Sequence, residues 1–220
     1  MSSRDNALWQ QCWRDRQTDF HQTEVSPLLT RFWRGLDLAP GSRIFVPLCG
    51  KSLDMIWLAQ QGYEVIGLEL SPVAVRAFFH ENHMQPTRRA VGRFTLWQSG
   101  RIVILCGDYF SVSRADLGSI DAVYDRAALT ALPEDIRRRY VAHLKKILPP
   151  ACKVFLLTVE DAEAGETREV RMGISAEIAA LYGNDFEIEL AHVESVTEAG
   201  RDEAGDARYA EHKVYRLVPG

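Results

Sequence analysis

Short runs of apolar, often β-branched residues alternate along this chain with helical patterns of hydrophobicity. Strands that are apolar at almost every position are typical of the centre of a parallel sheet, where helices cover both faces. Their alternation with helices predicts an α/β fold with a doubly wound, mostly parallel sheet and right-handed crossovers. The runs are RIFV (43–46), YEVIGLEL (63–70), RIVILC (101–106), IDAVYD (120–125) and KVFLLTV (153–159).

Three segments between these runs carry helix signals. The first ends at Gly62, and the second begins with Ser71 as a cap and Pro72 at the first helical position. The clearest helix begins near Pro133, shows apolar residues at helical spacing, and is terminated by the proline pair at 149–150. Each helix therefore has its own start or stop signal.

Two further segments predict antiparallel hairpins. FTLWQSGRIVIL (94–105) has Ser99 and Gly100 at its turn. Near the C-terminus, the strand-like runs FEIELAHVES (186–195) and HKVYRLV (212–218) flank a polar stretch that contains glycine. We expect this C-terminal hairpin to complete the sheet.

The length and composition indicate one globular domain. The chain has 220 residues, of which 46% are hydrophobic and 25% charged, which suits a single substantial core. Within it we expect an N-terminal helical lid over residues 1–35 and a Rossmann-like core over residues 36–220. The net charge of −4, with interspersed signs, provides no basic stripe for a nucleic-acid partner, and the mixed surface suits a monomer.

Targeting and metal signals are missing from the sequence. The first residues, MSSRDNALWQQCW, lack an apolar signal core, and no run approaches the about 20 apolar residues of a membrane helix. Four separated cysteines form no CxxC pair, and the histidines of HENH (80–83) lack the i, i+4 spacing of a helical zinc site. We expect a cytoplasmic protein with no membrane partner and no metal.

The stretch IFVPLCGKSLDM (44–55) places a tight turn between a strand and a helix. A phosphate-binding loop needs a glycine five positions before the Gly of Gly-Lys-Ser, and here that position is Phe45. A GxGxxG dinucleotide fingerprint also fails, because Gly50 is the one glycine in the turn. The turn therefore disfavours diphosphate ligands, but its bend at Gly50 can approach a neutral nucleoside or an amino-acid group.

The ends of the following strands carry side chains suited to adenosine. Glu69 lies 19 residues after Gly50, where a carboxylate can accept hydrogen bonds from both ribose hydroxyls. Asp108 and Tyr109, in CGDY, follow the next parallel strand and can meet the adenine. The alternative interpretation of Glu69 alone is an ordinary surface carboxylate after a strand.

These motifs resemble a known family. FVPLCGKSLDM, VIGLELSP and YDRAALTAL, together with Trp9, Trp13, Thr18, Phe20 and His21, closely resemble the bacterial thiopurine S-methyltransferases, and the likeness runs nearly end to end. The resemblance implies a class I methyltransferase that uses S-adenosyl-L-methionine and releases S-adenosyl-L-homocysteine. It also implies methylation of thiols. Bacterial members of the family are associated with methylating selenium and tellurium compounds as well as sulfur.

The resemblance assigns roles to residues on both sides of the cofactor. Trp9 and Trp13 lie four residues apart, so on a helix both rings can cover the methionine end of the cofactor. Arg126, after the fourth strand, is predicted to contact the cofactor or the anion that develops on the substrate. A second arginine on the substrate side is placed at Arg201, with Arg208 as the alternative. The predicted cofactor contacts are Trp9, Trp13, Phe20, Leu48, Gly50, Glu69, Asp108, Tyr109 and Arg126.

Two other interpretations of the chain are possible. A non-catalytic module of the same fold would bind an adenosine cofactor without turnover, but it would not need tryptophans in a lid. A nicotinamide-dependent oxidoreductase is disfavoured by the missing glycines. The simpler interpretation of Trp9 and Trp13 is that they anchor a helix to the core, and that of Asp125 and Arg126 is a salt bridge in a loop. The sequence leaves the acceptor itself open.

Overall fold

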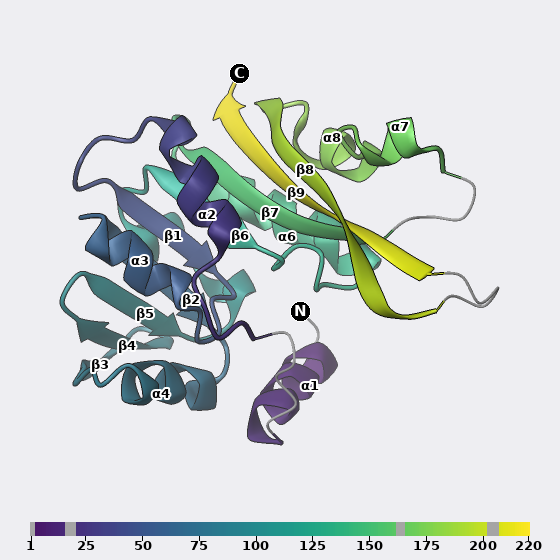
Figure 1. The fold of residues 1–220 in the computed structure, drawn as a ribbon. Helices are drawn as coiled ribbons and strands as arrows, with labels where there is room; N and C mark the ends of the chain where they lie inside the picture. Colours follow the sequence, from purple (N-terminus) through teal and green to yellow (C-terminus); the bar gives the residue numbers. More distant parts are fainter. Residues whose placement is uncertain (1–2, 16–20, 162–165, 202–206) are drawn as a thin grey trace.

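The computed structural model describes residues 3–15, 21–161, 166–201 and 207–220. Its strands form one nine-stranded sheet in the order β3-β4-β5-β2-β1-β6-β7-β9-β8 (Figure 1). In chain order the strands are β1 (Arg43–Pro47), β2 (Glu64–Glu69), β3 (Thr87–Val91), β4 (Phe94–Ser99), β5 (Ile102–Cys106), β6 (Ala122–Arg126), β7 (Lys153–Asp161), β8 (Phe186–Arg201) and β9 (Ala207–Pro219).

The centre of the sheet is parallel and both of its ends are antiparallel. Strands β5, β2, β1, β6 and β7 pair in parallel, whereas β3-β4-β5 and β7-β9-β8 pair antiparallel. The predicted doubly wound sheet and both predicted hairpins are confirmed. Strand β3 was not expected, because TRRAV is an exposed edge strand without the apolar alternation that marks a buried one.

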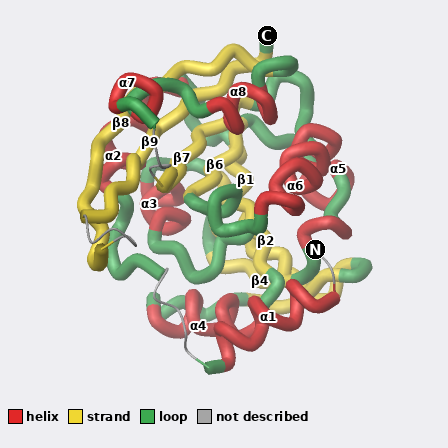
Figure 2. The backbone as a smooth tube through the Cα atoms, turned by 90° about the vertical axis from the view of Figure 1, so that its right-hand side faces the viewer, coloured by secondary structure: helices red, strands yellow, loops and turns green. Residues whose placement is uncertain are grey.

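Helices cover both faces of the sheet. They are α1 (Ser3–Arg14), α2 (Pro27–Phe32), α3 (Asp54–Gln60), α4 (Pro72–Glu81), α5 (Arg114–Leu117), α6 (Glu134–Ile147), α7 (Arg168–Arg171) and α8 (Ala176–Tyr182), with 3₁₀ helices η1 (Trp33–Leu36) and η2 (Tyr109–Ser111). Figure 2 shows the strands between α2 and α3 on one side and α5 and α6 on the other. The caps predicted for α4 are present, since Ser71 Oγ accepts from the N–H of Ala74 and Pro72 opens the helix.

Consecutive strand residues pack into two separate cores. Ile44 and Val46 of β1 pack with α2, α3 and α4, whereas Phe45 between them packs with α6 and α8 on the other face. Because successive side chains of a strand point to opposite faces, an apolar residue at every position supplies both cores. This explains the continuous apolar runs in the sequence.

The N-terminal segment divides into two parts. Helix α1 is present as predicted, and Trp13 at its end is buried. Leu29 of α2 and Trp33 of η1 are buried in the core formed with α3 and α4. The lid boundary at residue 35 stays a prediction. None of the helices described is long and apolar enough to cross a membrane.

The strand order reverses at β1. Strands β2 and β5 lie on one side of β1, and β6 and β7 lie on the other. In an open parallel sheet, ligands bind beyond the carboxyl ends of the strands at this switch point. The fold therefore places the turn after β1 at the centre of the candidate site.

Candidate active site

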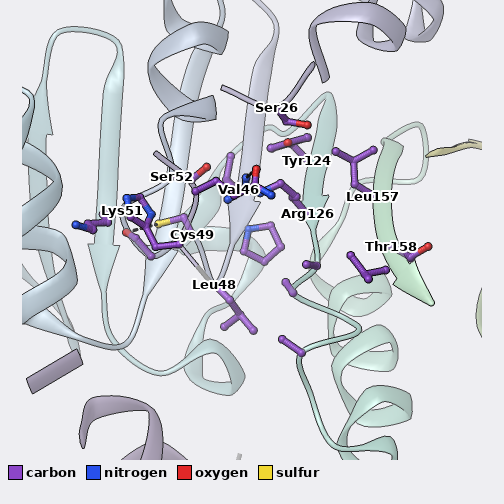
Figure 3. A pocket seen from close by; sticks show the side chains of 18 of the residues that line it. Ser26, Val46, Leu48, Cys49, Lys51, Ser52, Tyr124, Arg126, Leu157 and Thr158 are labelled. Carbon is purple, nitrogen blue, oxygen red and sulfur yellow. Dashed lines mark hydrogen bonds between the residues drawn. The ribbon is translucent and has the colours of Figure 1, made fainter. Parts of the chain in front are cut away.

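A cavity of about 400 Å³ lies at the carboxyl ends of the strands. Its walls come from the turn after β1, the ends of β2, β6 and β7, the segment before α2, and the β8–β9 hairpin. This volume suits a small-molecule ligand. Figure 3 shows Leu48, Cys49 and Lys51 on one side of the cavity, Arg126 and Tyr124 in the middle, and Leu157 and Thr158 on the far strand.

The turn after β1 has an unusual backbone. Leu48 and Gly50 both have positive φ angles, of 47° and 53°, while the N–H of Cys49 donates to the carbonyl of Leu68 at 3.0 Å. A Cβ added to Gly50 would lie 3.1 Å from Cζ2 of Trp13, so the indole of the predicted lid packs directly on this glycine. Glycine at position 50 thus permits both the turn and the close approach of α1.

Glu69 faces this turn from the end of β2. One carboxylate oxygen accepts from the N–H of Gly50 at 2.9 Å and the other from the N–H of Ser71 at 2.7 Å. The side chain is almost fully buried, and burial raises its pKa while the backbone N–H groups of Ser71, Gly50 and Leu70 oppose the rise. A carboxylate has about four acceptor sites, so Glu69 keeps acceptor capacity for ligand hydroxyls in the cavity that it lines.

Asp54, the first residue of α3, is a buried centre of hydrogen bonds that sequence reasoning missed. Its carboxylate accepts from the N–H of Ser26 at 2.8 Å, from Ser52 Oγ at 3.2 Å and from the hydroxyl of Tyr124 at 2.8 Å. It therefore ties the segment before α2, the turn after β1 and strand β6 together. Its position in LCGKSLD was the available signal, but two of its partners, Ser26 and Tyr124, are distant in sequence.

Arg126 reaches into the middle of the cavity. Its Nε lies 3.4 Å from Asp54 Oδ2 and its Nη1 donates to Gln22 Oε1. The ion pair of this partly exposed side chain is with Asp54, and the side chain also lines the cavity. Its predicted contact with the cofactor or the substrate stays a prediction. The pairing fixes the guanidinium where it can meet an anion.

Asp125 has a structural role next to this arginine. Its Oδ1 accepts from the N–H groups of Ala128 and Leu129, at 3.1 and 3.4 Å, and its Oδ2 accepts from the Tyr140 hydroxyl at 2.7 Å. Burial raises its pKa to about 6. Asp125 thus organises the turn that begins at Ala127, whose φ is 56°.

Asp108 and Tyr109 do not line the cavity. The Tyr109 ring is buried and stacks on Tyr140 with 4.7 Å between the ring centroids, and its hydroxyl donates to the Tyr140 carbonyl at 3.1 Å. Asp108 Oδ2 is 3.5 Å from Ser111 Oγ, and its Oδ1 is buried without a hydrogen-bond partner among the residues described. Their predicted contacts with adenine are therefore not seen in the cavity and stay a prediction.

Four other predicted site residues cannot be placed. Phe20 lies outside the described residues. Trp9 belongs to α1 and Arg201 ends β8, but the side chains of Trp9, Arg201 and Arg208 are outside the described part of the chain. The choice between Arg201 and Arg208 therefore stays open.

Comparison with known proteins identifies the family. Residues 4–219 match the family described as Thiopurine S-methyltransferase (TPMT). A relative of that name from Stutzerimonas stutzeri (strain A1501) is 60% identical over 218 residues, covering 99% of this chain and 92% of the relative. The chain belongs to the thiopurine S-methyltransferase family.

Other relatives agree with this family. A thiopurine S-methyltransferase from Nitrosospira multiformis is 44% identical over 211 residues, covering 96% of each chain. A SAM-dependent methyltransferase structure from Anabaena variabilis gives a TM-score of 0.63 at 18% identity, covering 96% of this chain and 94% of that one. A Burkholderia thailandensis 1,6-didemethyltoxoflavin-N1-methyltransferase, solved with S-adenosylhomocysteine, gives a TM-score of 0.60 at 13% identity. The match covers 97% of this chain and 87% of that one. These structures show the class I methyltransferase fold.

The cavity of this thiopurine S-methyltransferase family member extends beyond the predicted residues. His21 lines it near Lys51, and burial, with the Lys51 charge as a second cause, lowers the His21 pKa. At the opposite end, Thr158 of β7, Glu194 of β8 and His212 of β9 complete the wall. The sequence predicted the strands of these residues but not that the residues meet at one cavity wall, because Glu194 and His212 come together only through the pairing of β8 with β9.

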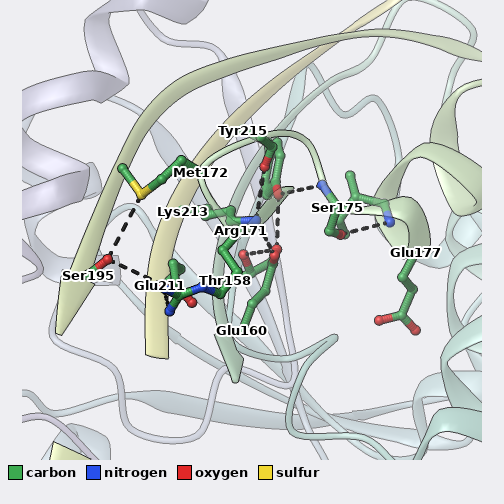
Figure 4. Close-up of polar contacts among 12 residues, drawn as sticks. Thr158, Glu160, Arg171, Met172, Ser175, Glu177, Ser195, Glu211, Lys213 and Tyr215 are labelled. Atoms are coloured by element: carbon green, nitrogen blue, oxygen red, sulfur yellow. Dashed lines mark hydrogen bonds and ion pairs between the residues drawn. The ribbon is translucent and has the colours of Figure 1, made fainter. Parts of the chain in front are cut away.

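A buried polar network supports the wall at Thr158 (Figure 4). Thr158 Oγ1 donates to Glu160 at 2.7 Å, and Lys213 Nζ lies 2.6 Å from the other Glu160 oxygen. Lys213 also donates to the carbonyl of Gly173 at 2.9 Å, and Arg171 of α7 pairs with Glu211 at 3.0 Å. The network therefore fixes α7 and the following turn on the sheet beside the cavity.

Proposed function

We propose that this S-adenosylmethionine-dependent methyltransferase transfers the methyl group to the sulfur of aromatic or heterocyclic thiols such as thiopurines. The family membership supports this acceptor class. The observation that supports the proposal is one cavity that is lined by the buried carboxylate of Glu69, by Arg126, and by Thr158, Glu194 and His212 from the strands beyond it.

The residues present fit S-adenosylmethionine. We propose that Glu69 accepts hydrogen bonds from the ribose hydroxyls with its remaining acceptor sites, while the turn of Leu48 to Gly50 lies against the nucleoside. Trp13 covers that turn and supplies an aromatic face suited to a sulfonium. When bound, the cofactor supplies an activated methyl group. Predicted contacts of Trp9 and Phe20 would extend this cover.

Methyl transfer to a thiolate requires little chemical assistance from the protein. An ionised thiol is a soft nucleophile, so the protein mainly orients two reactants and excludes water, and orientation alone contributes up to about 7–11 kcal/mol of barrier reduction. We propose that Arg126 stabilises negative charge on the acceptor, because its guanidinium lies in the cavity with Asp54 compensating one side. Arg201, with Arg208 as the alternative, is the proposed arginine on the acceptor side.

An acceptor panel tests this proposal. S-Adenosylhomocysteine release is measured with 6-mercaptopurine, 4-nitrothiophenol, selenite, tellurite and a hydroxyl analogue of each organic thiol. We expect turnover with the two organic thiols and none with the hydroxyl analogues. Turnover with selenium or tellurium compounds would extend the acceptor class. Cofactor binding without turnover on any sulfur compound would refute it and favour a binding module of the same fold.

A further inference from the structure

The acceptor end of the cavity contains a histidine and a carboxylate that the proposed mechanism does not use. His212 of β9 is paired across the sheet with Val159 of β7 on one side and Glu194 of β8 on the other, and all three line the cavity. His212 Nδ1 lies 4.0 Å from Glu194 Oε1. The imidazole therefore faces the cavity with a carboxylate beside it.

Glu194 is held in place from its other side. Its second oxygen lies 3.3 Å from His192 Nε2, and the His192 ring stacks on Phe32 at 4.8 Å between centroids with an interplanar angle of 24°. His192 and Glu194 are two residues apart on β8, so they share one face of the strand. The stacked ring thus anchors the carboxylate that faces His212.

The position of His212 defines what it can reach. Glu69 ends β2 and His212 lies on β9, four strands away in the sheet, which corresponds to about 19 Å at the usual spacing of about 4.8 Å per strand. With the cofactor ribose at Glu69, His212 lies at the end of the cavity remote from the cofactor. It is placed for a ring atom of the acceptor beyond the reacting sulfur.

That location suits the chemistry of heterocyclic thiols. Such compounds exist largely as thiones, in which the acidic proton is on a ring nitrogen and not on sulfur. We propose that His212, charge-balanced by Glu194, accepts this ring N–H proton. The N–H bond of the acceptor breaks, an N–H bond forms on the imidazole, and the electron pair delocalises through the ring onto sulfur, which becomes the nucleophile. The imidazolium is stabilised by the Glu194 carboxylate.

Among the described residues, few titratable groups face His212. Glu211 and Lys213, the sequence neighbours of His212, belong to the buried network on the opposite face of the sheet. The hairpin groups that face His212 are Glu194 and, behind it, His192. The remaining titratable groups that line the cavity are His21, Cys49, Lys51, Glu69, Tyr124 and Arg126. The inference rests on the proposed acceptor class.

An absorbance titration tests the proton transfer without turnover. 6-Mercaptopurine is bound in the presence of S-adenosylhomocysteine, and its spectrum, which distinguishes neutral thione from anion, is followed against pH. We expect the wild type to ionise the bound acceptor at lower pH than in free solution. His212→Gln should return the midpoint toward that of the free acceptor, and Glu194→Gln should do so in part. His80→Gln, at an exposed position of α4, should match the wild type. Equal midpoints for wild type and His212→Gln would overturn the proposal.

Kinetics with two acceptors separate this role from a structural one. Below the pKa of free 6-mercaptopurine, His212→Gln should lower kcat/KM for this thione on the order of a hundredfold, with recovery at higher pH. The rate with 4-nitrothiophenol, which has no ring N–H, should stay unchanged. Equal losses with both acceptors would contradict the proposal. If the wild type forms methylated product from neither acceptor, the proposed function is refuted. The titration decides the role of His212 independently of that result. Failure to bind 6-mercaptopurine would refute both proposals.

Discussion

Glu69 and Asp125 are both buried carboxylates at the ends of strands, yet their contacts give them different roles. Each oxygen of Glu69 has one backbone partner, and the side chain lines the cavity. Asp125 uses both oxygens on Ala128, Leu129 and Tyr140 and does not line it. The first is therefore placed for a ligand and the second for the local fold.

Replacement of Glu69 by glutamine should weaken the cofactor complex. An amide keeps one acceptor oxygen and loses the charge, and each hydrogen bond to a charged group contributes about 1.5–3 kcal/mol, so we expect the Kd for S-adenosylmethionine to rise about 10- to 100-fold. Isothermal titration calorimetry measures it. Glu64→Gln, exposed at the start of the same strand, is the matched control. An unchanged Kd for Glu69→Gln would remove the ribose assignment.

Replacement of Asp125 by asparagine should change how stability depends on pH. Burial raises the Asp125 pKa from 3.8 to about 6, so between about pH 4 and pH 6 the folded protein binds more protons than the unfolded chain. The contribution of this group to stability therefore falls as pH rises through that window, by up to about 3 kcal/mol. Asparagine retains an acceptor for Ala128 and Leu129 and carries no charge.

Urea unfolding of the wild type and Asp125→Asn at several pH values measures this difference. The free energy of unfolding of the variant, relative to the wild type, should increase from pH 4 to pH 6 and then level off. A difference that is constant over this range would contradict the assigned pKa.

Replacement of Arg126 by alanine should weaken both cofactor binding and turnover. The side chain lines the cavity, and its loss also leaves buried Asp54 without its guanidinium partner. We expect kcat/KM for the thiol to fall on the order of a hundredfold or more. Arg138→Ala, exposed on α6, is the matched control. Kinetics equal to those of the wild type would exclude a role for Arg126 in the reaction.

At the scale of elements, the turn after β1 and helix α1 depend on each other through Gly50. Gly50 and Gly41 both have positive φ, of 53° and 80°, but only a Cβ at Gly50 would meet another side chain, that of Trp13. Alanine at either position carries a similar backbone penalty, of order 1 kcal/mol. The difference between the two variants therefore reports the surroundings of Gly50, which are its contact with Trp13 and the cavity that it lines.

We expect both variants to lower the Tm by a similar amount. Gly50→Ala should also weaken binding of S-adenosylmethionine at least several-fold, whereas Gly41→Ala should leave binding unchanged. Differential scanning fluorimetry and calorimetric titration of both variants measure the two effects. Equal cofactor affinity in the two variants would indicate that the packing of Trp13 on the turn does not matter for the site.

The elements themselves could largely be predicted from the sequence, because continuous apolar runs, caps and prolines are local signals. The parallel centre, both hairpins and the positions of Glu69 and Arg126 at strand ends followed from them. The contacts of Asp54 could not be predicted, since Ser26 and Tyr124 are 28 and 70 residues away from it. The buried position of Tyr109 in the core was also not predicted, because the side chain of a residue that follows a strand can point either to the cavity or to α6.

At the scale of the whole molecule, one sheet links two ends of a single cavity. Glu69 of β2 lies at one end, and Thr158, Glu194 and His212, from β7, β8 and β9, lie at the other. The antiparallel β7-β9-β8 extension supplies the residues of the second end. We therefore propose that the parallel centre serves cofactor binding and that the extension supplies the acceptor side.

The position of the transferred methyl group tests this account most directly. The wild-type protein is incubated with S-adenosylmethionine carrying a ¹³C-labelled methyl group and with 6-mercaptopurine, and the product is analysed by mass spectrometry and NMR. We predict a singly methylated purine with the labelled carbon bonded to sulfur, together with an equal amount of S-adenosylhomocysteine. Labelled carbon on a ring nitrogen, or cofactor binding with no methylated purine, would contradict it.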